Sequence, residues 1–232
     1  MPMTYDLYIG DRTFSSWSLR GWLMLEKFNL PFRTHLVGLY SGTMAAELAA
    51  LAPARTVPVL RTPEGYVLTD SLAMAETLAE RHPDVALYPR DPAARSLARS
   101  ITAEMHSSFM ALRGDCPNMI SHVWKGFVPS DAVMADIARI EELWALARAR
   151  HGEGGPWLFG EYSLADVFYA PVALRITAYG LPVSAAAQTY INHHLTDPAF
   201  LAWRTDAQSE IHDPWPYPMP LDRLPWPAVN HS

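Results

Sequence analysis

The stretch TVPVLRTPEGYVLTDSLAMAETLAER, residues 56–81, carries the strongest folding signals of the chain. Two short runs rich in β-branched and apolar residues flank a turn at residues 63–65, which predicts two antiparallel strands. Asp70 and Ser71 then precede an apolar pattern of helical period, and both residue types favour the start of a helix. The stretch therefore predicts two paired strands followed by a helix.

The residues before this stretch predict alternating strands and helices. YDLYI (residues 5–9) indicates a strand, residues 17–25 a helix that ends before Pro31, and residues 32–39 another strand. A strand–helix–strand unit favours parallel strands with a right-handed crossover. With a short helix at residues 44–51, this part of the chain is predicted to form a small mixed sheet with helices on its faces.

The sequence pattern changes at the end of a first domain, predicted at residues 1–83. Residues 84–94 are punctuated by prolines and predict a linker. Apolar residues then recur at helical spacing through residues 95–211, first in a helix over residues 97–112, and predict an all-α domain. Residues 212–232 hold many prolines, so we expect an extended tail without regular structure.

The composition narrows the range of functions. The 232-residue chain carries a formal net charge of −6, which argues against a nucleic-acid partner. No apolar segment is long enough to cross a bilayer, so no membrane partner is expected. Cys116 is the only cysteine, which excludes an internal disulfide and indicates a reducing cytoplasm. None of the nine histidines falls in a metal-binding motif, so no metal is expected.

Two short motifs in the first domain each allow two interpretations. Pro58 lies between two valines, as in an edge strand or as a cis proline that turns the main-chain groups of Val57 outward, and the two are about equally favoured. Asp70 and Ser71 are helix caps by composition. The same pair also suits an α-amino acid, because a helix N-terminus attracts a carboxylate and an acid pairs with an amine.

A third motif, FSSWS (residues 14–18), opens the first predicted helix. Ser15 or Ser16 can cap this helix. A hydroxyl at a helix N-terminus also stabilises a thiolate held beside it, which lowers the pKa of the thiol. Further on, Ser163 and Asp166 form a capping-box variant before an apolar helix, which is a folding signal.

Together these motifs resemble the cytosolic glutathione transferase superfamily over about residues 4–210. The resemblance rests on the order and spacing of SSWSLR, APARTVPVL, TDSLAMAETLAER and GEYSLADVFYAP. SSWSLR is most similar to the zeta-like, serine-type pattern SSCSWR, with Trp17 in place of the cysteine and Leu19 in place of the tryptophan. The resemblance implies a thioredoxin-like α/β domain followed by an all-α domain, and a homodimer.

The resemblance also implies roles for individual residues. Ser15 would donate a hydrogen bond to the glutathione thiolate, with Ser16 and Ser18 structural. The residues implied to bind glutathione are Ser15, Arg55, Val57, Pro58, Asp70 and Ser71. The residues implied to line a hydrophobic acceptor site between the domains are Trp17, Met105, Phe109 and Arg113.

The activity implied is conjugation of glutathione, as co-substrate, to a hydrophobic electrophile, in the manner of a detoxification enzyme. A glutathione-dependent isomerase of the maleylacetoacetate type, or a peroxidase, would use the same thiolate. Trp17 in place of the cysteine of the zeta-like pattern favours conjugation over isomerisation. An alternative of another class is a non-catalytic binding module. The joint presence of three motifs argues against it, namely Ser15, Val57-Pro58 and Asp70-Ser71.

Overall fold

A computed structural model of the chain describes residues 4–209 and 214–227. Its described residues form two compact units. The first comprises the residues up to Val85 together with Ala202–Pro218, and the second comprises Ala86–Leu201 together with the residues from Met219 onward. The boundary expected between residues 211 and 212 lies outside the described residues.

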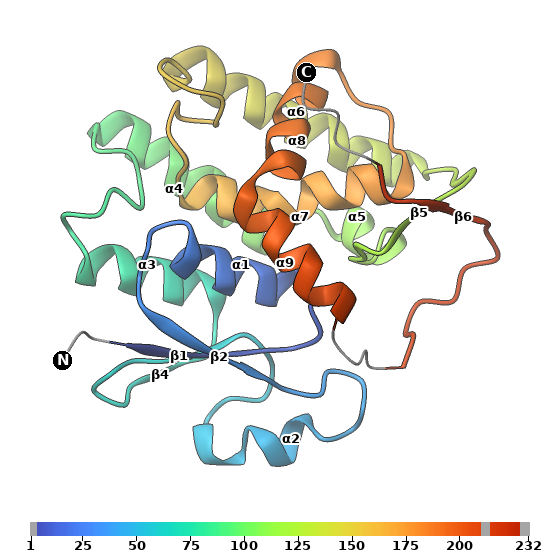
Figure 1. Ribbon diagram of the computed structural model, residues 1–232. Coiled ribbons are helices and arrows are strands. Elements are labelled where there is room, and N and C mark those ends of the chain that lie inside the picture. Colours follow the sequence, from blue (N-terminus) through green and yellow to red (C-terminus); the bar gives the residue numbers. More distant parts are fainter. Residues whose placement is uncertain (1–3, 210–213, 228–232) are drawn as a thin grey trace. The chain divides into compact units, whose positions relative to one another are not determined.

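The first unit contains a four-stranded mixed sheet (Figure 1). Its strands are β1 (Tyr5–Ile9), β2 (Phe32–Leu36), β3 (Val59–Arg61) and β4 (Val67–Leu68), in the order β2-β1-β3-β4. β1 pairs with β2 in parallel, whereas β3 pairs with β1 and with β4 in antiparallel fashion. Both the parallel unit and the later antiparallel pair are therefore confirmed.

The helices of this unit are α1 (Ser16–Glu26), α2 (Met44–Glu47) and α3 (Ser71–Arg81), with a 3-10 turn at Ala49–Leu51. Residues from the C-terminal part of the chain, within Ala202–Pro218, complete the core of this unit. The ring of Trp203 is fully buried, and its centroid lies 5.4 Å from that of Trp22 on α1. Its Nε1 donates to the main-chain oxygen of Arg12 at 3.1 Å. In the tail, Trp215 and Tyr217 place their rings edge-on to Phe14, at centroid distances of 5.1 and 5.9 Å.

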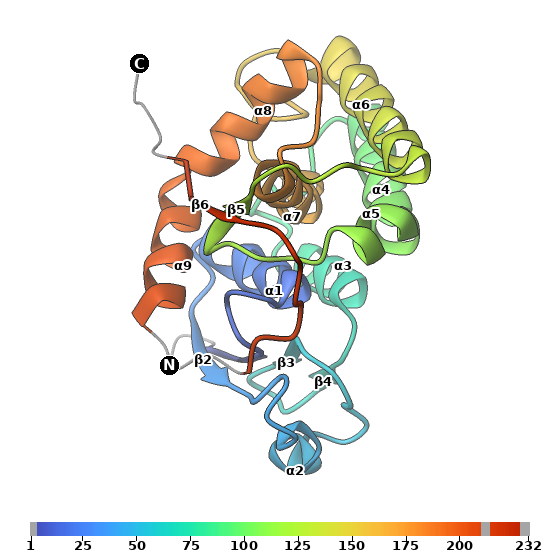
Figure 2. The ribbon, with the colours of Figure 1, turned by 90° about the vertical axis from the view of Figure 1, so that its right-hand side faces the viewer.

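The second unit is built from helices around α7, whose side chains are almost all buried. Figure 2 looks along α7 and shows α4, α5, α6 and α8 around it. The helix bounds are α4 Pro92–Ser107, α5 Met110–Asp115, α6 Asp131–His151, α7 Leu164–Tyr179, α8 Ala185–Thr196 and α9 Pro198–Ser209. α9 begins in this unit and continues into the residues assigned to the first unit.

One predicted helix is two helices. The pattern over residues 97–112 predicts one continuous helix, but α4 ends at Ser107 and α5 begins at Met110. Phe109 has a left-handed backbone (φ 63°), which no helix interior adopts. The Arg113 guanidinium holds the break by donating to main-chain oxygens of Ser108 and His106 at 2.9 and 3.3 Å, and to that of Met105. Apolar residues continue at helical spacing through the break, so the sequence pattern gives no signal that α4 ends there.

A second difference is a small sheet in the helical unit. β5 (His122–Trp124) pairs in antiparallel fashion with β6 (Arg223–Pro225), and Lys125 N donates to Asp222 O at 2.9 Å. The second unit is therefore helical apart from this short two-stranded sheet, and the expectation of a tail without regular structure is wrong at β6. Strands of three residues are too short to show an alternating pattern, and the prolines around β6 argue against a strand.

Candidate active site

The three motifs singled out in the first unit meet at one end of its sheet. In the β3–β4 pair Leu60 lies opposite Leu68, so Pro58, two residues before Leu60, and Asp70, two residues after Leu68, both lie beyond the same end of this pair. In the β1–β3 pair Tyr8 lies opposite Val59, so Gly10, two residues after Tyr8, and Val57, two residues before Val59, lie beyond that same end. Because α1 starts soon after β1 ends, the strand connections alone bring Ser15, Val57-Pro58 and Asp70-Ser71 to the same edge.

Two glycines allow the close approach of Val57-Pro58 to α1 and β1. A Cβ added to Gly10 would lie 3.0 Å from Cγ2 of Val57, and a Cβ on Gly21 would lie 3.0 Å from Cβ of Pro58. A Cβ at either position would therefore require Val57 or Pro58 to shift by a few tenths of an ångström. The peptide bond between Val57 and Pro58 is cis, which resolves the two interpretations of this proline.

Ser15 is the N-cap of α1, and its side chain is buried. Its Oγ accepts from Ser18 N at 3.2 Å and donates to Ser18 Oγ at 2.7 Å. Ser18 Oγ also accepts from Gly10 N at 2.9 Å, so it connects the end of β1 to the start of α1. The Ser15 hydroxyl is thus held at the positive end of an 11-residue helix, where a negative charge is stabilised.

Asp70 and Ser71 begin α3. Asp70 is exposed and is the N-cap, because its Oδ1 accepts from Leu72 N at 2.8 Å and Ala73 N at 3.0 Å. Ser71 is buried, and its hydroxyl has no hydrogen-bond partner among the described residues. A buried polar group without a partner is costly, and a ligand oxygen at this helix N-terminus would supply one.

The remaining residues predicted to bind glutathione differ in their surroundings. Val57 and Pro58 are buried, and the main-chain groups of Val57 bond to no other residue in the part of the chain that the structure describes. Arg55 is exposed and forms no ion pair or hydrogen bond with any described residue. Val57 therefore offers a main-chain donor and acceptor to a ligand. The side chain of Arg55, by contrast, is not held in place by a hydrogen bond or ion pair with any described residue.

The residues predicted to line the acceptor site belong to both units, and each has a local role. Trp17 is half-buried, and the guanidinium carbon of Arg20 lies 4.5 Å from its ring centroid. Met105 and Phe109 are buried among the helices of the second unit, and Arg113 braces the α4–α5 break. Their role in an acceptor site stays a prediction.

The chain's own thiol is no candidate nucleophile. Cys116 is fully buried, and burial raises the pKa of its thiol to about 12, so that almost none is thiolate at neutral pH. In residues 4–209 and 214–227 no three histidine, cysteine or carboxylate side chains gather as metal ligands. No helix in these ranges has the length and apolarity of a bilayer-spanning segment. Thiol chemistry at this site therefore needs a thiol brought by a ligand.

Sequence reasoning found the three motifs but missed what holds them together. It treated Ser18 as structural without naming a partner, and it assigned no packing role to Gly10 or Gly21. The signals for both glycines exist only when the register of the strands is known, because each contact joins residues more than thirty positions apart.

Comparison with known proteins agrees with this geometry. A family model described as the glutathione S-transferase N-terminal domain matches residues 14–81. A probable maleylacetoacetate isomerase of Caenorhabditis elegans is 31% identical over 213 residues, covering 90% of this chain and 95% of that protein. A maleylacetoacetate isomerase of Pseudomonas aeruginosa is 29% identical over 144 residues, covering 59% of this chain and 64% of that protein.

Solved structures show the same fold. A Burkholderia glutathione transferase homologue with bound glutathione has a TM-score of 0.65 at 25% identity, covering 89% of this chain and 98% of that chain. The omega-class glutathione transferase 2S of Trametes versicolor has a TM-score of 0.69 at 17% identity, covering 90% and 96% of the two chains. With the relative of 31% identity matched along nearly its whole length, these similarities show that the chain belongs to the glutathione S-transferase superfamily of enzymes, in its zeta-like group.

Proposed function

We propose that the chain conjugates glutathione to a hydrophobic electrophile, with Ser15 stabilising the glutathione thiolate. The observation that carries this proposal is the meeting of three complementary groups at one end of the sheet. Ser71 has a buried hydroxyl in need of a partner, Val57 has main-chain groups suited to strand-like pairing, and Ser15 caps α1. A tripeptide with a carboxylate and amine at one end and a thiol in its middle matches these groups in kind.

The hydrogen bonds of Ser15 allow it to serve a thiolate. Its proton now goes to Ser18 Oγ, which also accepts from Gly10 N. When the Ser15 hydroxyl rotates toward a ligand sulfur, Ser18 Oγ keeps the donor from Gly10, so no buried acceptor is left without a partner. In the proposed reaction the thiolate sulfur forms a bond to an electrophilic carbon. In a substitution an anionic leaving group departs from that carbon, and in an addition the product takes up a proton.

Asp70 is proposed to hold the amine of glutathione, and Asp70→Asn tests this role. Asparagine keeps the oxygen that caps α3 but lacks the negative charge, so the free energy of unfolding should change little. Because Asp70 is exposed, we expect KM for glutathione to rise only about five-fold, with kcat nearly unchanged. Steady-state kinetics with varied glutathione measure both constants.

The matched control for this prediction is Glu80→Gln, which removes one exposed acidic charge from the same helix away from its start. It should leave KM within about two-fold of the wild-type value. An equal rise of KM in both variants would show that Asp70 acts only through net charge, and the assigned role would be wrong.

A second candidate activity is cis–trans isomerisation, which the names of the curated relatives favour. The same thiolate would add to a conjugated double bond, and its elimination after rotation would return free glutathione. Assays with maleylacetoacetate and with a chlorinated aromatic compound separate the two activities. Turnover of maleylacetoacetate without consumption of glutathione would make isomerisation the function, whereas consumption with the chlorinated compound alone supports conjugation.

We further propose that the enzyme acts as a homodimer in the cytoplasm. The only cysteine is buried as a free thiol, which suits a reducing compartment. Light scattering coupled to size-exclusion chromatography measures the mass directly, and a mass near twice 25.9 kDa is expected.

A further inference from the structure

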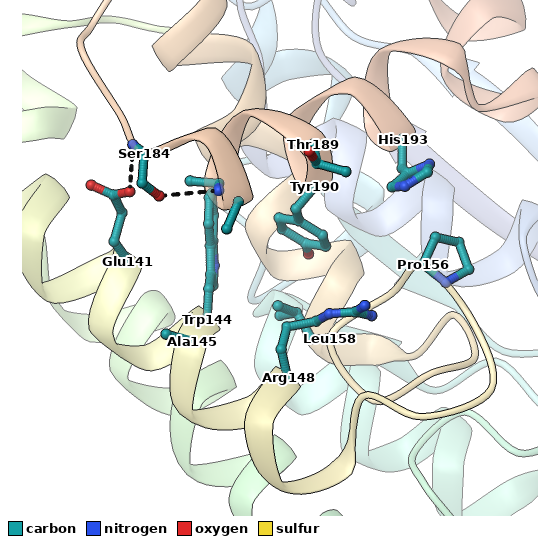
Figure 3. A pocket seen from close by; sticks show the side chains of 12 residues that line it. Glu141, Trp144, Ala145, Arg148, Pro156, Leu158, Ser184, Thr189, Tyr190 and His193 are labelled. Carbon is teal, nitrogen blue, oxygen red and sulfur yellow. Dashed lines mark hydrogen bonds between the residues drawn. The ribbon is translucent and has the colours of Figure 1, made fainter. Parts of the chain in front are cut away.

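A pocket of about 280 Å³ lies within the helical unit, between α6 and α8 (Figure 3). The loop that follows α6 closes one side of it, through Pro156 and Leu158. Its walls include the buried ring of Trp144 and the side chain of Leu158, so the middle of the pocket is largely apolar. Every residue that lines this pocket belongs to the second unit. None of them is among the candidate active-site residues of the first unit.

One end of the pocket holds a fixed positive charge. The Nη1 of Arg148 donates to the main-chain oxygens of Gly155, at 2.8 Å, and of Trp157. These two bonds tie the guanidinium to the loop. Its Nε and Nη2 groups bond to no residue in the described ranges, although they are the fork with which an arginine binds a carboxylate.

The other end holds a fixed negative charge. Oε1 of Glu141 accepts from Ser184 N at 2.8 Å, just before α8 begins. Figure 3 shows the Glu141 side chain directed to Ser184, while that of Arg148 runs toward the loop at Pro156. Oε2 of Glu141 forms no hydrogen bond or ion pair within residues 4–209 and 214–227. The pocket thus offers an acceptor at one end and donors at the other.

The two charges are too far apart to neutralise each other. Glu141 and Arg148 lie seven residues apart on α6, which corresponds to about 10 Å along the helix axis. A fully extended tripeptide spans about the same length. We propose that this pocket binds an extended zwitterion of about tripeptide length, with its ammonium group at Glu141, its carboxylate at Arg148 and an apolar group in the middle.

The physical gain comes from charges that are already in place. Both side chains are held by main-chain hydrogen bonds, so a ligand does not have to order them, and the loss of side-chain entropy on binding is reduced. Because Glu141 is partly exposed and Arg148 is exposed, each charge contributes modestly, and we expect a Kd of about 0.1–1 mM. The proposal does not depend on the chemistry of the first unit.

The test is a titration of the full-length protein with the tripeptide Gly-Leu-Gly. Binding is followed by NMR through the indole N–H signal of Trp144, assigned with Trp144→Phe. We expect a saturable shift with Gly-Leu-Gly and none with the same peptide acetylated at its N-terminus and amidated at its C-terminus. Glu141→Gln and Arg148→Gln should each weaken binding by about five-fold or more.

Matched controls lie on the same helix outside this pocket. Glu142→Gln and Arg150→Gln remove the same charges, and both should bind within about two-fold of wild type. The proposal is overturned if the blocked peptide binds as well as the free one, or if no saturable shift occurs. Should Arg148→Gln unfold the loop, Glu141→Gln and the two peptides decide, because neither changes the Arg148 contacts.

Discussion

Replacing Ser15 with alanine is expected to lower kcat/KM for glutathione conjugation by about 10- to 150-fold. This range corresponds to the roughly 1.5–3 kcal/mol that a hydrogen bond to a charged group contributes. The loss should fall mainly on kcat, because the hydroxyl stabilises the thiolate and the other contacts to glutathione remain. Steady-state kinetics with an electrophile that the enzyme accepts measure the change.

The same substitution also removes the N-cap of α1, so its effect on folding must be separated from its effect on chemistry. Loss of this cap should lower the free energy of unfolding by about 1 kcal/mol, which leaves the enzyme folded. Ser16→Ala is the matched control, since it removes a neighbouring buried hydroxyl that does not cap the helix. It should keep activity within about three-fold, and an equal loss in both variants would remove Ser15 from its catalytic role.

Asp166→Ala is expected to cause the largest loss of stability, about 3–5 kcal/mol in urea unfolding at pH 7. The carboxylate is fully buried and accepts four hydrogen bonds. Its donors are Leu158 N at 3.1 Å, Ser163 N at 2.9 Å, Ser163 Oγ at 3.0 Å and Tyr190 Oη at 2.9 Å. Alanine would leave these groups buried without a partner, at the start of the most buried helix.

Asp166→Asn is the comparison variant, because an amide oxygen keeps part of this network. A loss of about half the size is expected from it. A loss below about 1 kcal/mol in Asp166→Ala would show that the capping box contributes little, contrary to this account.

Asp166 also predicts the direction of a pH effect. Burial raises the pKa of its carboxyl to about 6, from an ordinary value of 3.8. Between pH 4 and pH 6 the folded state therefore holds a proton that the unfolded state has lost. The free energy of unfolding should fall as the pH rises through this interval, by an amount on the order of 3 kcal/mol. Urea unfolding at several pH values measures the slope, which Asp166→Asn should flatten.

The sequence predicted the first unit well because its signals are local. A turn at residues 63–65, a cap at Asp70 and the strand pattern of β1 each act over a few residues, and the sheet follows from the order of the elements. Ser15, Pro58 and Ser71 were located in the same way. The resemblance to a family added the roles of these residues, which spacing alone left open.

What the sequence did not predict depends on contacts between distant residues. The pairing of β5 with β6 joins residues about one hundred positions apart, and neither strand has a signal of its own. The left-handed Phe109 falls within an unbroken apolar pattern, and the bonds from Arg113 to the carbonyl groups at the end of α4 are visible only in the folded chain. The free ends of Glu141 and Arg148 likewise appear only once the start of α8 and the loop that follows α6 are packed against α6.

The stabilisation of a thiolate by Ser15 is tested most directly by the pKa of the glutathione thiol in the binary complex. Thiolate absorbance in the ultraviolet, recorded against pH for the complex and for the protein alone, gives this value. Cys116 should not interfere, because burial raises the pKa of its thiol to about 12. We expect a thiol pKa at least about one unit below the ordinary value near 8.5, with most of the decrease lost in Ser15→Ala. A thiol that titrates in the complex as it does in free glutathione would contradict this expectation.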